Sequence, residues 1–371
     1  MTAATKQWVY FGTYTHHNGE SRAEGIYLYE FDPASGTLEF KRAEATLPNP
    51  SLLAATRDGR FLFAVNEVGD FEGHPGGAVS AYAIDPTNGA LTFLNAQPSG
   101  GADPCYISLD YDGKWALVSN YSGGSISVYP IGADGRLGDA ASFVQHTGSS
   151  GVNAGRQEAP HAHSIITDPY DRFVLAADLG KDQVVVYKFD RTTGQLTPND
   201  PPAVNLAPGA GPRHMAFLTY GQFFYAVNEL NLTITAFKYD ADLGRLAEVQ
   251  VVSALQNPGS GIEMAADLHV AQNGRYLYTS TRGYATGNDS ISVFVVDQTN
   301  GHLERVEVVP SGGKTPRNFS FDLSENFLLV AHQDSSNVVT FRIDSRTGRL
   351  TPTGQVTEIP SPVCVRFVEH S

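Results

Sequence analysis

The chain repeats one pattern of apolar and polar positions seven times. Each copy has a run in which apolar and polar residues alternate, then an acidic or small turn, a glycine, and a leucine that opens a second run. Alternation with a period of two is typical of a strand with one buried face, and glycine suits the positive φ of tight hairpin turns. The pattern therefore predicts seven hairpins, roughly fifty residues apart, which turn at Gly36, Gly89, Gly135, Gly194, Gly244, Gly301 and Gly348.

A second kind of hairpin precedes each of these except the first. It begins near a proline, as in residues 104–121 and 212–230, and turns at polar residues before an aromatic-rich strand. Two consecutive hairpins make a four-stranded antiparallel blade, whose strands we name A to D in chain order. Seven such repeats predict an all-β chain folded as a seven-bladed β-propeller.

The two ends of the chain are expected to complete one blade. Residues 7–14 follow the pattern of a strand B with no strand A before it, whereas residues 362–368 follow that of a strand A with nothing after it. Their pairing would close the ring and remove exposed sheet edges, which promote aggregation. We therefore expect residues 1–371 to form a single domain. Two β-sandwiches in tandem are the structural alternative, but no linker divides the chain, and the longest irregular stretch, about residues 146–160, only interrupts a blade.

Polar residues gather where the strands nearest the central channel are predicted to begin and end. Antiparallel pairing places the start of strand A beside the end of strand B, so these positions should meet at one mouth of the channel. Polar side chains grouped at the ends of apolar strands indicate a pocket, although propellers also fill this mouth with structural hydrogen bonds. The positions expected to bind substrate are Glu67, Asn120, His161, Asp178, His214, Asn228 and Asp267.

Four further residues of this mouth form the candidate catalytic group: His163, Arg213, Glu229 and Arg282. Two arginines that face an acid and a histidine can bind an anion and support proton transfer. The histidine pair around Ala162 has no third ligand at a recognisable spacing, and the glycine-rich segments lack the context of a phosphate-binding loop, so we expect no metal and no cofactor. Because no G-x-S-x-G elbow or Cys/His nucleophile pattern is present, we expect direct attack by water.

Composition narrows the partners and the compartment. A net charge of −14 argues against nucleic acid and anionic membranes as partners, since both need a basic surface, but it allows an anionic metabolite. Cys105 and Cys364 are too few for a disulfide framework and predict buried thiols in a reducing compartment. The chain has no signal-like start and no apolar run of about 20 residues. We therefore expect a cytoplasmic protein, either a monomer or a weakly associating homodimer.

Several segments recur in a known family in the same order and spacing. They are FGTYT, PSLLAATRDGRFLFAVNE, NYSGGSISVY, RQEAPHAHS, DLGKDQVVVYKFD, GPRHMAF and AVNEL. Together they make nearly the whole chain resemble the propeller-type bacterial 6-phosphogluconolactonases, which are related to the fungal 3-carboxy-cis,cis-muconate cyclases. The chain departs from the family at residues 265–269 and 281–283, where relatives commonly have AAE-I-H and N-R-G.

The resemblance implies an activity and roles for particular residues. The activity is hydrolysis of a small anionic sugar lactone, 6-phospho-D-glucono-1,5-lactone, to 6-phosphogluconate, a step of glucose metabolism in the pentose phosphate pathway. The histidine, arginines and glutamate that the cyclase branch uses fall on His163, Arg213, Arg282 and Glu229. The arginines would bind phosphate or the developing oxyanion, and Glu229 or His163 would activate water. A muconate-type cyclase and a non-catalytic protein-binding propeller stay open, since one fold supports different functions.

Overall fold

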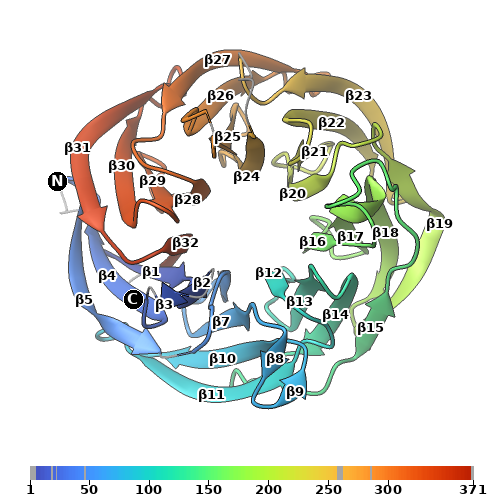
Figure 1. The fold of residues 1–371 in the computed structure, drawn as a ribbon, viewed down its shortest axis with the longest axis horizontal. Coiled ribbons are helices and arrows are strands. Elements are labelled where there is room, and N and C mark those ends of the chain that lie inside the picture. The colour runs from blue at the N-terminus through green and yellow to red at the C-terminus, as the bar shows by residue number, and fades with distance from the viewer. Residues whose placement is uncertain are drawn as a thin grey trace.

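The computed structural model describes residues 6–17, 20–21, 23–45, 47–256, 262–284 and 286–368. Within these ranges, seven four-stranded antiparallel sheets stand around a common axis as the blades of a propeller (Figure 1). The all-β, seven-bladed fold expected from the repeats is confirmed.

Each blade has its strand A nearest the axis and its strand D on the outside (Figure 1). From blade 1 to blade 7, strand A is β32 (Pro362–Val368), β6 (Leu53–Ala55), β12 (Pro104–Leu109), β16 (Ala162–Thr167), β20 (Pro212–Phe217), β24 (Met264–Val270) and β28 (Pro316–Phe321). Strand B is β1 (Gln7–Thr13), β7 (Phe61–Asn66), β13 (Trp115–Asn120), β17 (Phe173–Asp178), β21 (Phe223–Asn228), β25 (Tyr276–Arg282) and β29 (Phe327–His332). Strand C is β4 (Ile26–Asp32), β10 (Ala78–Ile84), β14 (Ser125–Pro130), β18 (Gln183–Asp190), β22 (Thr233–Asp240), β26 (Ser290–Val296) and β30 (Asn337–Ile343). Strand D is β5 (Thr37–Ala45), β11 (Leu91–Pro98), β15 (Ser142–Gln145), β19 (Gln195–Asn205), β23 (Arg245–Ser253), β27 (Leu303–Pro310) and β31 (Leu350–Glu358).

Short elements lie outside the blades. They are the hairpins β2 (His16–His17) with β3 (Glu20–Ser21) and β8 (Asp70–Phe71) with β9 (His74–Pro75), and the 3-10 turn η1 (Leu179–Lys181) after β17. No helix among the described residues is long and apolar enough to cross a membrane.

The apolar core lies between neighbouring blades. Strands B are buried along their whole length, as in β13, whereas strands D such as β23 are largely exposed. One cluster packs Trp8 of blade 1 with Phe63 of blade 2 and Val118 of blade 3. The blades therefore stabilise one another by burying apolar surface across their interfaces.

The predicted closure of the ring is confirmed. Strand β32 pairs antiparallel with β1, with Trp8 opposite Val368 and Phe11 opposite Val365. The backbone N–H of Val365 also donates to Oδ1 of Asn318 in blade 7 at 2.8 Å. The C-terminal strand thus completes blade 1 and joins it to the last blade.

The seven turn glycines join each blade to the one before it. All seven have positive φ, as the hairpin pattern predicted. An added Cβ at six of them would come closest to the aromatic ring that opens strand B of the preceding blade, and at Gly89 it would lie about equally close to Leu28 and the Trp8 ring. The glycine and ring pairs are Gly36 with Phe327, Gly89 with Trp8, Gly135 with Phe61, Gly194 with Trp115, Gly244 with Phe173, Gly301 with Phe223 and Gly348 with Tyr276.

Candidate active site

The innermost strands begin with β-bulges that carry the polar residues. In blades 3 to 7 the register between strands A and B shifts near the start of strand A, so that one or two residues of strand A are left out of the pairing. These residues are Cys105, His163, Arg213 with His214, Ala266 with Asp267, and Arg317. Because a bulge re-aims side chains that would otherwise alternate, five blades can direct polar groups to one place.

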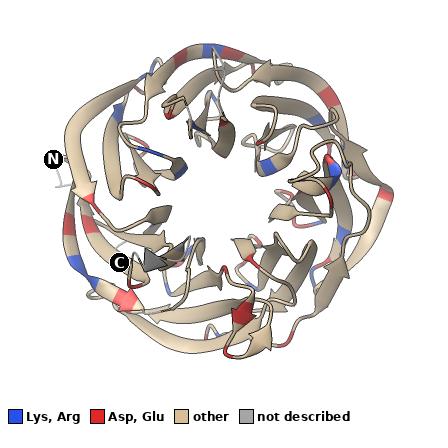
Figure 2. Cartoon of the chain, in the orientation of Figure 1, with Lys and Arg blue, Asp and Glu red and all other residues tan. Residues whose placement is uncertain are grey.

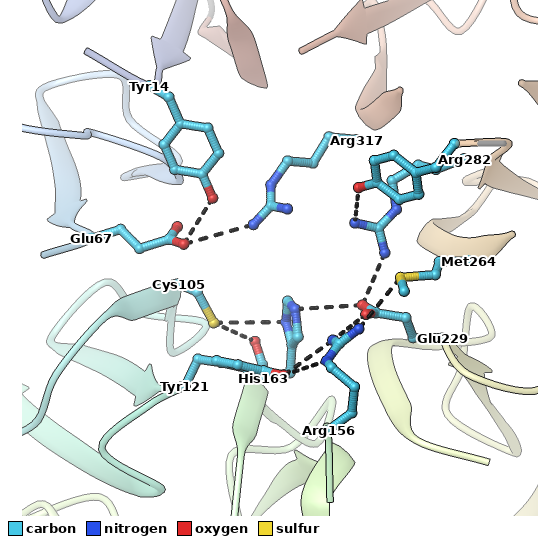
Figure 3. A pocket seen from close by; sticks show the side chains of 11 residues that line it. Tyr14, Glu67, Cys105, Tyr121, Arg156, His163, Glu229, Met264, Arg282 and Arg317 are labelled. Carbon is cyan, nitrogen blue, oxygen red and sulfur yellow. Dashed lines mark hydrogen bonds and ion pairs between the residues drawn. The ribbon is translucent and has the colours of Figure 1, made fainter. Parts of the chain in front are cut away.

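A cavity of about 390 Å³ lies among these strand ends. Its wall is made by Tyr14, Glu67, Cys105, Tyr121, Arg156, His163, Glu229, Met264, Arg282, Tyr284 and Arg317 (Figure 3). The volume is within the range of small-molecule sites, about 300–1,000 Å³. Charged and hydrogen-bonding groups dominate the wall, which suits a polar ligand.

Glu229 is held by three arginines. It follows β21 directly and is 2% exposed. Nη2 of Arg156 donates to its Oε1, while Nε of Arg213 and Nη2 of Arg282 lie 2.8 and 3.0 Å from its Oε2. Burial raises the pKa of Glu229, but the charges of Arg282, Arg213 and Arg156 outweigh it and hold the pKa well below its usual 4.5. Glu229 is therefore a carboxylate at neutral pH.

His163 lies beside this cluster as a neutral imidazole. Its Nε2 is 3.9 Å from Oε2 of Glu229, and its ring meets those of Tyr121 and His214 edge-on. Burial first, and then the charge of Arg213, hold the pKa of His163 well below its usual 6.5. The thiol of Cys105 donates to the backbone carbonyl of His163 at 3.3 Å.

Arg213 lies behind the wall and is 1% exposed. Besides its ion pair with Glu229, its Nη1 donates to the carbonyl of Ala266 and to Nε2 of His214, the latter at 3.1 Å. Burial, followed by the charges of Arg282 and Arg317, lowers the pKa of Arg213 to about 10, so that it stays charged at neutral pH. The structure therefore brings the four candidate catalytic residues together, with three on the wall and Arg213 behind Glu229.

His214 and Asp267, which the sequence suggested as substrate ligands, lie behind Arg213 and are not on the cavity wall. Nδ1 of His214 donates to Oδ1 of Asp267 at 2.7 Å. Burial, followed by the charge of Arg213, lowers the pKa of His214 to about 4. The neutral imidazole thus carries its proton on Nδ1 and accepts from Arg213 at Nε2.

Asn120, Asp178 and Asn228 also lie off the wall. The Asn120 amide donates to Ser99 O and Ser125 Oγ, and the Asn228 amide to the hydroxyls of Thr233 and Thr235. Asp178 accepts from His146 Nδ1 and from the backbone N–H of His161. Because side chains alternate along a strand, Asn228 faces its own blade while the next residue, Glu229, faces the cavity.

His161 supports the wall from outside. Its ring stacks on that of Tyr121, with centroids 4.6 Å apart, and its Nδ1 lies 3.1 Å from the carbonyl oxygen of Tyr121. Of the seven predicted substrate ligands, Glu67 is the one that the described structure places on the cavity wall.

Several wall residues were not selected from the sequence: Tyr14, Cys105, Tyr121, Arg156, Met264, Tyr284 and Arg317. Arg156 is the most consequential, because it pairs with Glu229 from the irregular stretch before β16. The available signal was its position in the family segment RQEAPHAHS. Tyr14, Tyr121 and Arg317 occupy strand ends of the predicted mouth.

Among the described residues, no group of three or more His, Cys, Asp and Glu side chains is arranged to hold a metal ion. Cys105 and Cys364 are free and buried, as the sequence suggested.

Comparison with known proteins identifies the family. The family described as "Lactonase, 7-bladed beta-propeller" matches residues 8–367. The 6-phosphogluconolactonase of Bacillus subtilis (strain 168) is 37% identical over 366 residues, which cover 99% of each chain. The 6-phosphogluconolactonase of Formosa agariphila is 33% identical, over 88% of this chain and 90% of that one. The structure described as the periplasmic gluconolactonase PpgL of Pseudomonas aeruginosa is 34% identical, with a TM-score of 0.91 over 99% of this chain and 100% of that one.

The chain belongs to this lactonase family of seven-bladed β-propellers, and it is an enzyme of the lactonase class. The resemblance noted in the sequence is thereby confirmed. The cavity at the strand ends is where the fold gathers groups that can bind an anion and move a proton.

Proposed function

We propose that the chain hydrolyses 6-phospho-D-glucono-1,5-lactone to 6-phosphogluconate in this cavity. The observation that carries the proposal is the charge around the cavity. Among the described residues, three guanidiniums line it, those of Arg156, Arg282 and Arg317, against two carboxylates, those of Glu67 and Glu229. The whole chain has a net charge of −14, and many of its acidic residues lie on outer strands and connecting loops (Figure 2). A locally positive, partly buried site in an acidic protein favours an anionic substrate.

The relatives support this choice of substrate. Two are named 6-phosphogluconolactonase, and a third is described as a gluconolactonase. The same family match gives no support to the cyclase or the non-catalytic propeller, which the sequence alone left open.

In the proposed mechanism, His163 is the general base. Its neutral imidazole can accept a proton from a water molecule as the water oxygen bonds to the lactone carbonyl carbon. Arg282 on the wall stabilises the oxyanion that forms. The bond from the carbonyl carbon to the ring oxygen then breaks, and the proton returns from His163 to the leaving alkoxide, which gives the hydroxy acid.

Glu229 has a different role in this mechanism. Because three arginines hold its pKa well below 4.5, it is a weak base, and its charge serves to fix Arg156, Arg213 and Arg282 around the cavity. The lowered pKa of Glu229 thus supports His163 as the base.

The test measures acid release from lactones above the spontaneous rate. The wild type should exceed that rate clearly, and His163→Asn should lower kcat by about 100-fold or more. His302→Asn, in an exposed turn of blade 6, is the matched control and should change kcat less than about twofold. A wild type no faster than the spontaneous reaction would remove the proposal.

A pH profile separates the two candidate bases. It is recorded on unphosphorylated glucono-1,5-lactone, because phosphate monoesters themselves titrate at about pH 6. A base must be deprotonated, and the pKa of His163 is lowered, so kcat/KM should hold as pH falls to 6.5 and decline only below it. Glu229→Gln should keep this acid limb and His163→Asn should lose it; the reverse result would assign the base to Glu229.

The proposal also places the enzyme in the cytoplasm. Its support is the pair of free, buried cysteines, Cys105 and Cys364, which suit a reducing compartment. Cell fractionation with lactonase activity as the readout tests this location, and activity confined to the periplasm would contradict it.

A further inference from the structure

The cavity has two groups of polar side chains on opposite sides of the ring. His163, Glu229 and Arg282 come from blades 4, 5 and 6. Tyr14, Glu67 and Arg317 come from blades 1, 2 and 7, and Figure 3 shows them pointing toward one another on the side away from Glu229. The mechanism proposed above uses only the first group.

Arg317 differs from the other arginines of the cavity. Arg156, Arg213 and Arg282 all pair closely with Glu229. The Nη2 atom of Arg317 lies 3.8 Å from Oε1 of Glu67, and its guanidinium lies 5.1 Å from the centre of the Tyr14 ring. Neither contact has the geometry of a hydrogen bond, so Glu67 holds the Arg317 guanidinium less closely than Glu229 holds the other three.

Glu67 shows the complementary feature. Its Oε1 accepts a hydrogen bond from the Tyr14 hydroxyl at 2.7 Å. Its Oε2 is buried and has no hydrogen-bond partner among the described residues. A buried carboxylate oxygen without a donor destabilises the protein unless a ligand supplies the donor.

We propose that Arg317, Glu67 and Tyr14 form a subsite for the phosphate-bearing end of a polyhydroxy substrate. Arg317 donates to the phosphate oxygens, and Oε2 of Glu67 accepts from a neighbouring sugar hydroxyl. Tyr14 fixes both partners, by stacking under the guanidinium and by donating to Oε1 of Glu67.

The arrangement suits one molecule that carries both groups. Arginine binds phosphate through two parallel N–H groups, and a carboxylate that accepts hydroxyl protons is a common way to hold a polyol. A sugar lactone phosphorylated at the end remote from its carbonyl can place its ring ester near His163 and its phosphate near Arg317. This inference rests on the proposed function and assigns the part of the site that selects for phosphate.

The first experiment compares two substrates, 6-phosphoglucono-1,5-lactone and glucono-1,5-lactone. Arg317→Gln should lower kcat/KM for the phosphorylated lactone by about 10- to 100-fold, chiefly through KM, because a charge-assisted hydrogen bond is lost. The unphosphorylated lactone should change less than about threefold. Arg317→Lys keeps the positive charge but not the paired N–H donors of the guanidinium. Its kcat/KM for the phosphorylated lactone should lie between those of the wild type and Arg317→Gln.

Controls keep this experiment specific. Arg346→Gln removes an exposed arginine from the same blade and should leave both substrates unchanged. Thermal unfolding shows whether Arg317→Gln is folded, and Arg317→Lys provides the comparison if it is not. Equal losses on both substrates, or discrimination that disappears in Arg156→Gln but persists in Arg317→Gln, would overturn the assignment.

The second experiment needs no catalysis and uses inorganic phosphate measured by titration calorimetry. The wild type should bind phosphate, and Arg317→Gln should weaken binding at least tenfold. Glu67→Gln removes a negative charge beside the guanidinium and should strengthen phosphate binding several-fold, since like charges repel. If no lactone is hydrolysed but phosphate binding follows this order, the proposed function fails and the subsite stands. Phosphate binding that is insensitive to Arg317 would overturn the subsite.

Discussion

At the scale of single residues, the buried carboxylate of Asp267 organises the groups behind the cavity. Its Oδ1 accepts from His214 Nδ1 and the backbone N–H of Leu268, and its Oδ2 accepts from Asn318 Nδ2 and the backbone N–H of Phe319. Both oxygens therefore face donors. Because His214 donates at Nδ1, its Nε2 is left to accept from Arg213, so Asp267 sets the position of an arginine that it does not contact.

The substitution Asp267→Asn tests this role. Whichever way the amide turns, its NH₂ group meets donors, so a buried network is left unsatisfied. We expect the free energy of unfolding to fall by about 3 kcal/mol and kcat to fall at least tenfold as Arg213 loses its fixed partner. Denaturant unfolding and lactone hydrolysis measure the two effects.

The control is Asp242→Asn on an exposed carboxylate, which pairs with Arg172 at 3.4 Å. An exposed pair contributes about 1 kcal/mol or less, so this variant should retain wild-type stability and kcat. Equal behaviour of the two variants would contradict the role given to Asp267.

The sequence located strand ends but not the direction of each side chain. Glu229 and Asn228 are neighbours at the end of one strand, yet only Glu229 reaches the cavity. At the start of strand A the two-residue bulge at Arg213 and His214 interrupts the alternation from which direction would be inferred. Arg156 lies in a stretch with no periodic pattern, so neither period nor pairing could place it.

At the scale of the element, the turn between strands C and D is both a hairpin and an interblade contact. Gly135 has φ of 82°, and an added Cβ would lie 2.2 Å from the ring of Phe61 in the preceding blade. Gly354 has φ of 83° in strand β31, but a Cβ there would meet nothing within 4 Å. Substitutions at these two glycines therefore distinguish the cost of backbone strain from the cost of disturbed packing between blades.

We expect Gly354→Ala to lower the free energy of unfolding by about 1–2 kcal/mol, the cost of left-handed backbone for alanine. Gly135→Ala should lower the free energy of unfolding by about 1–3 kcal/mol more, because its methyl group displaces the Phe61 ring. Denaturant unfolding of both variants measures the difference. Equal losses would show that the turn glycines serve the hairpin alone.

The hairpins themselves were predictable because the turn glycine recurs in every repeat beside an alternating strand. Their partner rings were not, since Gly135 and Phe61 lie far apart in sequence and meet only when blade 3 packs on blade 2. The local sequence pattern thus determines the hairpin, whereas the packing of one blade on the next determines which aromatic side chain the hairpin contacts.

At the scale of the whole molecule, the ring is held closed by strand β32 without a covalent link. Its pairing with β1 turns the unpaired ends of the first and last repeats into an ordinary blade, as the sequence pattern required. The same closure brings Arg317 of blade 7 beside Tyr14 of blade 1. The phosphate subsite proposed above therefore lies at the seam, where the first and last repeats of the chain meet.

A circular permutant tests whether the position of the seam matters. Residue 371 is joined to residue 1, and new ends are opened between Asp112 and Gly113, in the turn between strands A and B of blade 3. The new seam again separates one strand A from strands B to D, so the pairing between the strands of every blade is retained. We expect cooperative unfolding within about 5 °C of the wild type and unchanged lactonase activity.

Deletion of residues 362–371 is the matched opposite case. It leaves β1 with an unpaired inner edge and removes Cys364 and Val368 from the core between blades 1 and 2. We expect loss of cooperative unfolding and of activity, together with aggregation through the exposed edge. The permutant breaks the chain but keeps every strand, whereas the deletion keeps the rest of the chain continuous but removes one strand. A stable permutant and an unstable deletion variant would show that stability depends on completing each sheet. A deletion variant that melts like the full chain would refute the closure as the source of stability.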